Sequence, residues 1–70
     1  MKLHQLRALV MTADCGSIRA AARQLGVSQT SVAKALRELE EHLHLPLLVR
    51  NANGVVLTQY GQSLLQHARQ

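Results

Sequence analysis

Basic side chains without acidic neighbours occupy the middle of this 70-residue chain. The segment from Cys15 to Arg37 contains no aspartate or glutamate. Its four basic residues are Arg19, Arg23, Lys34 and Arg37. The formal net charge is +4 and the pI is near 10.3. A surface of this sign attracts polyanions such as nucleic acid, although a basic run can also be an ordinary solvated face. The secondary structure predicted for this segment distinguishes between the two interpretations.

Metal-binding and enzymatic chemistry find little support among the other reactive residues. Cys15 is the only cysteine, so the chain has neither an internal disulfide nor a CxxC pair for zinc. His42 and His44 are two residues apart, which places them on different sides of a helix. The carboxylates are Asp14 and three glutamates crowded together at positions 38, 40 and 41. Because these residues supply no set of nucleophile, base and orienting acid, we expect neither an enzyme nor a metal site.

Length and composition indicate one small folded domain. Hydrophobic residues make up 47% of the chain, with a single proline and one aromatic residue, Tyr60. A chain of this size buries only about 60% of the surface that it exposes when unfolded, so a partner could add stability. No apolar run approaches the roughly 20 residues of a membrane-spanning helix, and the N-terminus lacks a signal segment. We therefore expect a soluble protein of the cytoplasm that does not associate with membranes.

Apolar residues at helical spacing predict two helices before residue 27. The first ends at Gly16, and the second begins after Ser17 as its N-cap and ends at Gly26. The residues expected to face the core are Leu3, Leu6, Leu9, Val10 and Ala13 in the first helix, and Ile18, Ala21, Ala22 and Leu25 in the second.

The stretch RQLGVSQTSV, residues 23 to 32, breaks the helical pattern and restarts it at once. Gly26 and Val27 form the predicted turn, Ser28 caps the next helix, and that helix runs over about residues 29 to 42. Its core stripe is Val32, Leu36, Leu39 and Leu43; its outward stripe is Thr30, Lys34, Arg37 and Glu41, with Ala33 on the flank and Gln29 in the first turn. Two helices joined by so short a turn form a helix-turn-helix, whose second helix can enter a DNA major groove. A plain helical hairpin in a small bundle is the alternative for this segment.

A hairpin signal follows the third helix. LLVR, residues 47 to 50, and VVLT, residues 55 to 58, flank NANG, in which Asn53 and Gly54 tolerate the positive φ of a tight turn. Thr58 then caps a fourth helix with an apolar stripe of Leu64, Leu65 and Ala68, which we expect to continue past Gln70. The predicted fold is mostly α: a winged helix-turn-helix with a three-helix core over residues 1–58, a two-stranded wing, and the start of a linker or dimerisation helix over residues 58–70.

The whole chain resembles the N-terminal DNA-binding domain of LysR-type transcriptional regulators. The motifs that carry the resemblance are LHQLRALV, GSIRAAARQLGVSQTSVAKALRELE, LPLLVR and LTQYG. The resemblance implies a bacterial regulator that binds double-stranded DNA and pairs through its fourth helix, as a homodimer or, at full length, a tetramer. It also implies an absent C-terminal region that senses a small-molecule effector, with no cofactor in the present domain.

Site residues follow from the resemblance and from the outward face of the third helix. We expect Gln29, Thr30 and Lys34 to contact bases, since the Gln29 amide can pair with an adenine edge. The residues expected to contact phosphate or to position the domain are Ser28, Ser31, Arg37, Arg50, Arg19 and Asn53, and those expected to form the dimer are Leu64, Leu65 and Ala68. Thr30, Ala33 and Asn53 depart from the proline, serine and arginine common in the family. The alternative function is a winged-helix module that binds acidic proteins through its basic face.

Overall fold

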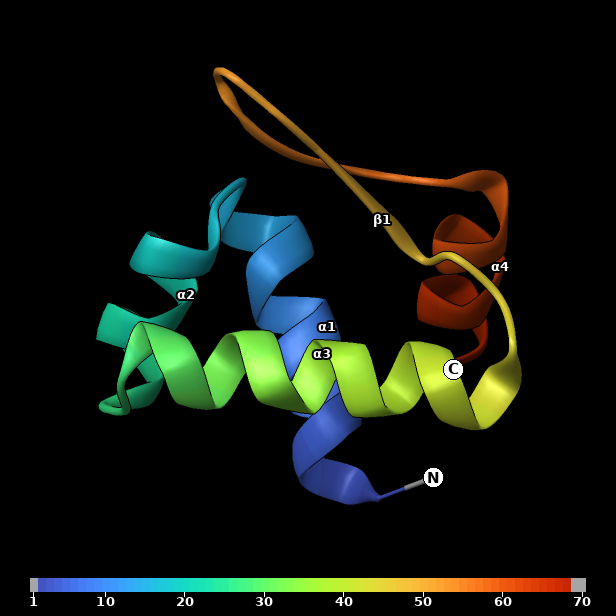
Figure 1. Ribbon diagram of the computed structural model, residues 1–70, viewed down its shortest axis with the longest axis horizontal. Helices are drawn as coiled ribbons and strands as arrows, with labels where there is room; N and C mark the ends of the chain where they lie inside the picture. The colour runs from blue at the N-terminus through green and yellow to red at the C-terminus, as the bar shows by residue number, and fades with distance from the viewer. Residues whose placement is uncertain (1, 69–70) are drawn as a thin grey trace.

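Four helices and one hairpin make up the chain in a computed structural model that describes residues 2–68 (Figure 1). The elements, in chain order, are α1 (Leu3–Cys15), α2 (Ile18–Leu25), α3 (Gln29–Leu43), β1 (Leu48–Asn51), β2 (Gly54–Leu57) and α4 (Gln59–Ala68). In Figure 1, α3 crosses the front of the molecule over α1, with α2 near its N-terminal end and α4 near its C-terminal end. The hairpin rises above this helical layer, so the predicted winged helix-turn-helix fold is confirmed.

The helix boundaries lie where the cap residues predict them. Gly16 and Gly26 end α1 and α2 in the left-handed conformation, with φ of 79° and 70°. Ser17 Oγ accepts the N–H of Ala20 at 3.1 Å, and Ser28 Oγ accepts the N–H of Ser31 at the same distance. Each serine therefore satisfies one of the amide groups left free at a helix start.

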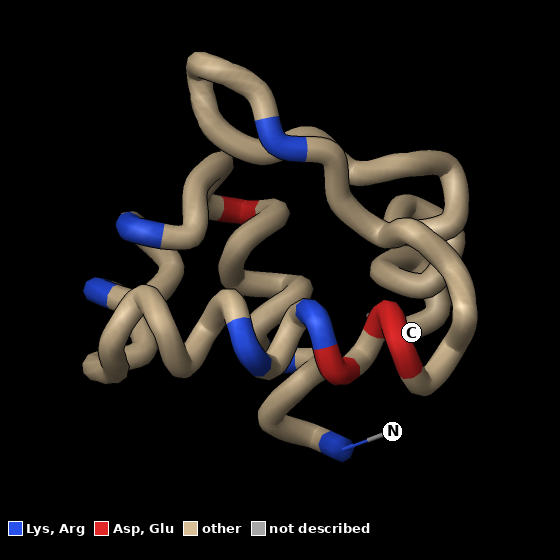
Figure 2. The backbone as a smooth tube through the Cα atoms, in the orientation of Figure 1, with Lys and Arg blue, Asp and Glu red and all other residues tan. Residues whose placement is uncertain are grey.

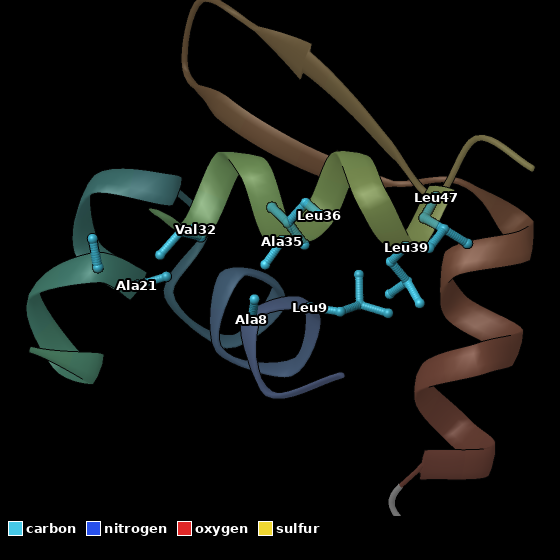
Figure 3. Close-up of a cluster of buried hydrophobic side chains, with 9 residues drawn as sticks. Ala8, Leu9, Ala21, Val32, Ala35, Leu36, Leu39 and Leu47 are labelled. Atoms are coloured by element: carbon cyan, nitrogen blue, oxygen red, sulfur yellow. The ribbon is translucent and has the colours of Figure 1, made fainter. Parts of the chain in front are cut away.

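The hydrophobic core lies between α1, α2 and α3 and is closed by the segment before β1 (Figure 3). Its buried members are Ala8, Leu9, Ala21, Ala22, Val32, Ala35, Leu36, Leu39 and Leu47. The predicted core stripes of α2 and α3 are confirmed, since their other members Ile18, Leu25 and Leu43 are half-buried against this cluster. Small alanines on α1 and α2 allow the helices to approach closely around the larger leucines.

The predicted inward face of α1 is confirmed at Leu9 and wrong at Leu3, and its other predicted members are only half-buried. The buried residues of this helix are Gln5, Ala8, Leu9 and Thr12, whereas Leu3 is 68% exposed and Leu6, Val10 and Ala13 are half-buried. The physical reason is that α1 packs against both α2 and α3, so its small residues face the crowded side. Gln5 fits there because its Oε1 accepts the N–H of Lys2 at 3.1 Å.

The wing is an antiparallel hairpin whose turn differs from the prediction. Asn51 pairs with Gly54, so Ala52 and Asn53 are the two loop residues and Asn–Gly is not the central pair. Asn53 does not adopt a positive φ; Gly54 does, at 137°. Asn51 Oδ1 accepts the N–H of Asn53 at 2.9 Å, which supplies the local turn bond instead.

The wing also docks on the turn between α1 and α2. The N–H of Val55 donates to the carbonyl oxygen of Gly16 at 3.1 Å. A Cβ at position 54 would collide with that same carbonyl oxygen, so Gly54 is required by space as well as by its φ. The hairpin is thus tied to the helical layer near its turn and not only at its base.

α4 begins as predicted, with Thr58 Oγ1 accepting the N–H of Gly61 at 3.1 Å. Leu64, one of the three residues expected to form the dimer, packs against the core of its own chain. Leu65 is half-buried and Ala68 is exposed, and Gln70 lies outside the described residues. Among residues 2–68, no helix is both long and apolar enough to cross a membrane.

Candidate nucleic-acid interface

The outward face of α3 carries the residues predicted to read bases. Gln29, Thr30 and Lys34 are exposed, as is Arg37 one turn further along, because the opposite face of the helix holds Val32 and Leu36 in the core. The core packing thereby fixes which side chains point away from the domain. The structure confirms their exposure, and their contacts with DNA stay a prediction.

The first turn of α3 presents backbone amides as well as side chains. The first intrahelical bond joins the N–H of Val32 to the carbonyl of Ser28 at 3.2 Å. Ser28 Oγ caps Ser31 and lies 2.9 Å from Ser31 Oγ, so these two predicted positioning residues hold each other at the helix start. The amides of Gln29 and Thr30 precede the first intrahelical bond, at the end of the helix that favours anions.

A groove between α3 and the wing brings together two of the predicted phosphate contacts. Its volume is about 190 Å³, and its lining residues are Ile18, Ala33, Leu36, Arg37, Glu40, Leu48 and Arg50. Arg37 enters it from α3 and Arg50 from β1, where Arg50 pairs with Val55. Two arginines 13 positions apart in the sequence thus line one groove.

The other two predicted positioning residues lie beside this groove and at the hairpin turn. Arg19 is the second residue of α2, is exposed, and directly follows Ile18 of the groove. Asn53 is exposed in the loop of the hairpin, apart from the α3 surface. The structure therefore brings Arg37 and Arg50 to one groove, while Arg19 is exposed on α2 and Asn53 is exposed in the hairpin loop.

Charge is divided along α3 as the sequence predicts. Figure 2 shows basic positions on α2, on the wing and in the middle of α3, with the acidic positions of α3 at its C-terminal end near α4. Glu38 and Glu41 are exposed there. An extended anion would meet less repulsion over the N-terminal half of α3 than over its C-terminal end.

Glu40 has a role that the sequence analysis missed. In the sequence it is only one of three crowded glutamates. In the structure it is half-buried, and its Oε2 accepts the N–H of Leu47 at 2.8 Å and that of Leu48 at 3.4 Å. It therefore joins α3 to the start of the wing. No periodicity or spacing in the sequence separates Glu40 from Glu38 and Glu41, since the bond is made to backbone seven residues further on.

Neither a metal site nor a catalytic set emerges from the described part of the chain. Within residues 2–68, no group of three or more histidine, cysteine, aspartate or glutamate side chains could hold a metal ion. Cys15 is a half-buried free thiol. The side chains of the candidate surface are amides, hydroxyls, an ammonium and guanidinium groups.

Comparison with protein families and relatives agrees with this surface. The family described as "Bacterial regulatory helix-turn-helix protein, lysR family" matches residues 3–62. The transcriptional regulator TfdS of Cupriavidus pinatubonensis is 44% identical over 69 residues, which cover 99% of this chain and 23% of TfdS. The small neutral protease regulatory protein of Streptomyces coelicolor is 43% identical over 67 residues, or 96% of this chain and 21% of that protein. The chain therefore spans about a quarter or less of the length of these relatives, which are named as regulators.

Solved structures lead to the same family. The complex of the CbnR DNA-binding domain with DNA has a TM-score of 0.95 and 36% identity, covering 99% of this chain and 79% of that one. Full-length CbnR, a LysR family transcriptional regulator, has a TM-score of 0.94 and 36% identity over 99% of this chain and 24% of CbnR. A DNA complex of the BenM DNA-binding domain has a TM-score of 0.94 at 32% identity, covering 99% of this chain and 78% of that domain. The chain carries a DNA-binding domain for transcription regulation and belongs to the lysR family of bacterial regulatory helix-turn-helix proteins.

Proposed function

We propose that the N-terminal half of α3 enters the major groove of double-stranded DNA and that Gln29, Thr30 and Lys34 contact base edges there. The observation that carries the proposal is the exposed start of α3, which contains no acidic residue and follows the turn at Gly26. Arg37 and Arg50 line the groove between α3 and the wing beside it. A glutamine amide can bond two positions of one adenine, which discriminates between bases by about 1–3 kcal/mol.

The positioning contacts surround this base-reading surface. Arg37 and Arg50 bind the phosphate backbone where it crosses the groove between α3 and the wing, and Arg19 binds it from α2. Ser28 and Ser31 hold the first turn of α3, whose free amides lie at the end of the helix that favours phosphate. Asn53 reaches toward the minor groove from the hairpin loop.

The test compares a base contact with a phosphate contact on DNA selected from a random duplex pool. Gln29→Ala should relax the preference at one base position with a small loss on random duplexes. Arg50→Ala should weaken binding to all sequences alike and reduce the slope of log affinity against log salt by about 0.9.

Two outcomes would overturn the proposal. Unchanged base preferences in Gln29→Ala would contradict base reading by α3. Salt-independent binding, or equal affinity for unrelated acidic proteins, would favour the alternative of a protein-interaction module.

Pairing of two copies is the second part of the proposed function. Leu65 and Ala68 remain available on α4, and Ala68 lines an apolar groove of about 410 Å³ together with Leu3, Leu6, Arg7, Val10, Met11 and Leu25. The leucines and valine of α1 that do not face the core are thus gathered at this groove, where a second copy can cover them. Leu65→Glu should weaken self-association in sedimentation and lower affinity for a duplex with two half-sites. Equal affinity for one and two half-sites would contradict the dimer.

The relatives that the chain matches are about four times its length. We infer that the rest of the polypeptide senses a small-molecule effector and that the present domain itself needs no cofactor. The protein acts in the cytoplasm, where bacterial DNA is found, as a homodimer or tetramer. A ligand that changes DNA affinity of the full-length protein but not of residues 1–70 would support this division of roles.

A further inference from the structure

The base of the wing is held from two sides at one short segment. Leu47 is 1% exposed, and its carbonyl oxygen accepts the N–H of Thr58 at 3.0 Å, while the carbonyl of Pro46 accepts the Thr58 hydroxyl at 2.6 Å. The amides of Leu47 and Leu48 instead meet the carboxylate of Glu40. Thr58, which caps α4, thus bonds to the carbonyl groups of this segment, and Glu40 of α3 bonds to its amides.

The Glu40 bond is the stronger candidate for setting where the wing lies relative to α3. A distance of 2.8 Å to Leu47 N is that of a charge-assisted hydrogen bond, whereas 3.4 Å to Leu48 N is long and weak. Arg50 lies two residues after Leu48 on the same strand, about 7 Å along it at 3.3 Å per residue. Leu48 and Arg50 share one face of β1 and both line the groove with Glu40.

An acidic side chain in that groove is unfavourable for a surface that binds phosphate. Glu40 lines the same groove as Arg37 and Arg50, so its charge opposes any phosphate placed between them. The carboxylate of Glu40 accepts hydrogen bonds from the amides of Leu47 and Leu48. If these bonds hold the strand that carries Arg50 in place, the gain in phosphate binding by Arg50 offsets the repulsion from Glu40.

We propose that Glu40 is a positioning residue that fixes the wing against α3 and so allows Arg50 to contact DNA together with Arg37. This inference rests on the proposed function for its effect on DNA, while the bond itself can be tested on the free protein. Thr58 holds the same segment next to α4, and Val55 ties the wing to the turn between α1 and α2, whereas Glu40 joins the segment directly to α3.

The experiment measures affinity for one selected duplex in matched variants that remove the same charge. Glu41→Ala should leave affinity equal or higher, since Glu41 is exposed and its carboxylate repels phosphate. Glu40→Ala should lower affinity by about three- to tenfold despite losing the same charge, because the wing loses its bond to α3. Glu40→Gln keeps an acceptor oxygen and should bind at least as well as the unaltered chain.

A double-mutant cycle with Arg50→Ala separates positioning from general loss of stability. In the Glu40→Ala background, Arg50→Ala should lower affinity by less than about twofold, because Arg50 no longer reaches its phosphate. Glu40→Asp keeps the charge but is shorter, so it should show the same loss of coupling, and it replaces Glu40→Ala if that variant does not fold. Circular dichroism at the binding temperature establishes which variants are folded.

Amide exchange of Leu47 in the free protein tests the bond without DNA. Exchange should be faster in Glu40→Asp and Glu40→Ala than in Glu40→Gln and Glu41→Ala. Unchanged exchange in Glu40→Asp, equal affinity gains in Glu40→Ala and Glu41→Ala, or independent losses in the cycle would overturn the inference. A chain that binds no duplex at all would instead refute the proposed function, and the exchange data would still decide the role of Glu40.

Discussion

The N-terminal and C-terminal ends of α3 differ in the contacts that their residues make. At the N-terminal end, Ser28 caps the helix and the polar side chains that follow point outward. At the C-terminal end, His44 closes the helix in the left-handed conformation, at φ 56°, and Glu40 and Leu39 turn toward the wing and the core. The polar side chains at the N-terminal end are therefore accessible to a partner, while the C-terminal end contacts other parts of the same chain.

This difference shows that charge alone does not identify the role of a residue on α3. Glu38, Glu40 and Glu41 are three acids within one turn, yet only Glu40 is half-buried and bonded to the backbone of the wing segment. Lys34 and Arg37 are likewise both basic, but only Arg37 lines the groove shared with Arg50. The contacts of each side chain, set by its angle around the helix, separate binding residues from anchoring ones.

The largest effect is expected from a substitution on the buried face of α3, compared with one on its exposed face. Leu39 has no exposed surface, so Leu39→Ala should lower the free energy of unfolding by roughly 2–5 kcal/mol. A domain of this size has only about 4–10 kcal/mol in total, so much of its stability would be lost. Lys34→Ala, on the exposed face, should change stability by less than about 0.5 kcal/mol. Urea denaturation measures both, and similar losses would contradict the division of α3 into faces.

A second test concerns the wing that the C-terminal end of α3 supports. Gly54→Ala should destabilise the domain by about 1–3 kcal/mol, since a Cβ there meets the Gly16 carbonyl and the φ is unfavourable for alanine. Gly26→Ala is the matched control: its φ is also positive, but its Cβ would meet nothing within 4 Å. It should therefore lose only about 1 kcal/mol. Thermal unfolding compares them, and a larger loss in Gly26→Ala would contradict the docking of the wing on α1 and α2.

Local signals explain why so much of the fold could be predicted. Ser17, Ser28 and Thr58 each cap a helix through bonds to amides three residues ahead, and Gly16 and Gly26 end helices by adopting a positive φ. These interactions are short-range, so residue type and spacing contain them. The outward face of α3 followed from the same logic, because its leucines define the opposite side.

Contacts between distant segments explain what could not be predicted. The orientation of α1 depends on α2 and α3 packing against it together, which favoured Ala8 and Thr12 over Leu3 and Val10 as inward residues. The bond from Glu40 to Leu47 and the space around Gly54 depend in the same way on how the wing returns to the helices. Neither arrangement has a periodic signature.

A third test addresses the N-terminal end of α3. Ser28→Ala removes the acceptor for the Ser31 amide and should lower the free energy of unfolding by about 1 kcal/mol. Ser17→Ala, which removes the equivalent cap of α2 at the same distance of 3.1 Å, should produce a similar loss. Only Ser28→Ala should also weaken binding to duplex DNA at a temperature where both variants are folded, because it frays the turn that carries Gln29. Equal DNA affinities would indicate that the first turn of α3 does not contact DNA.

The smallest effect is expected at the C-terminal end, where His44 adopts a conformation that suits glycine. A left-handed residue other than glycine costs about 1–2 kcal/mol, and glycine loses about 0.5–1 kcal/mol more backbone entropy on folding, so His44→Gly should stabilise the domain by about 0.5–1 kcal/mol. The helix-ending bond from the His44 N–H to the Glu40 carbonyl involves backbone only and is retained. His42→Gly, within the last turn of α3, should have the opposite sign, because glycine inside a helix is destabilising by about 1 kcal/mol. Thermal unfolding of the two variants measures the difference, and DNA affinity should be unchanged in His44→Gly because His44 is not among the residues proposed to contact or position DNA. A loss of stability in His44→Gly would mean that the imidazole side chain, and not the backbone, closes the C-terminal end of α3.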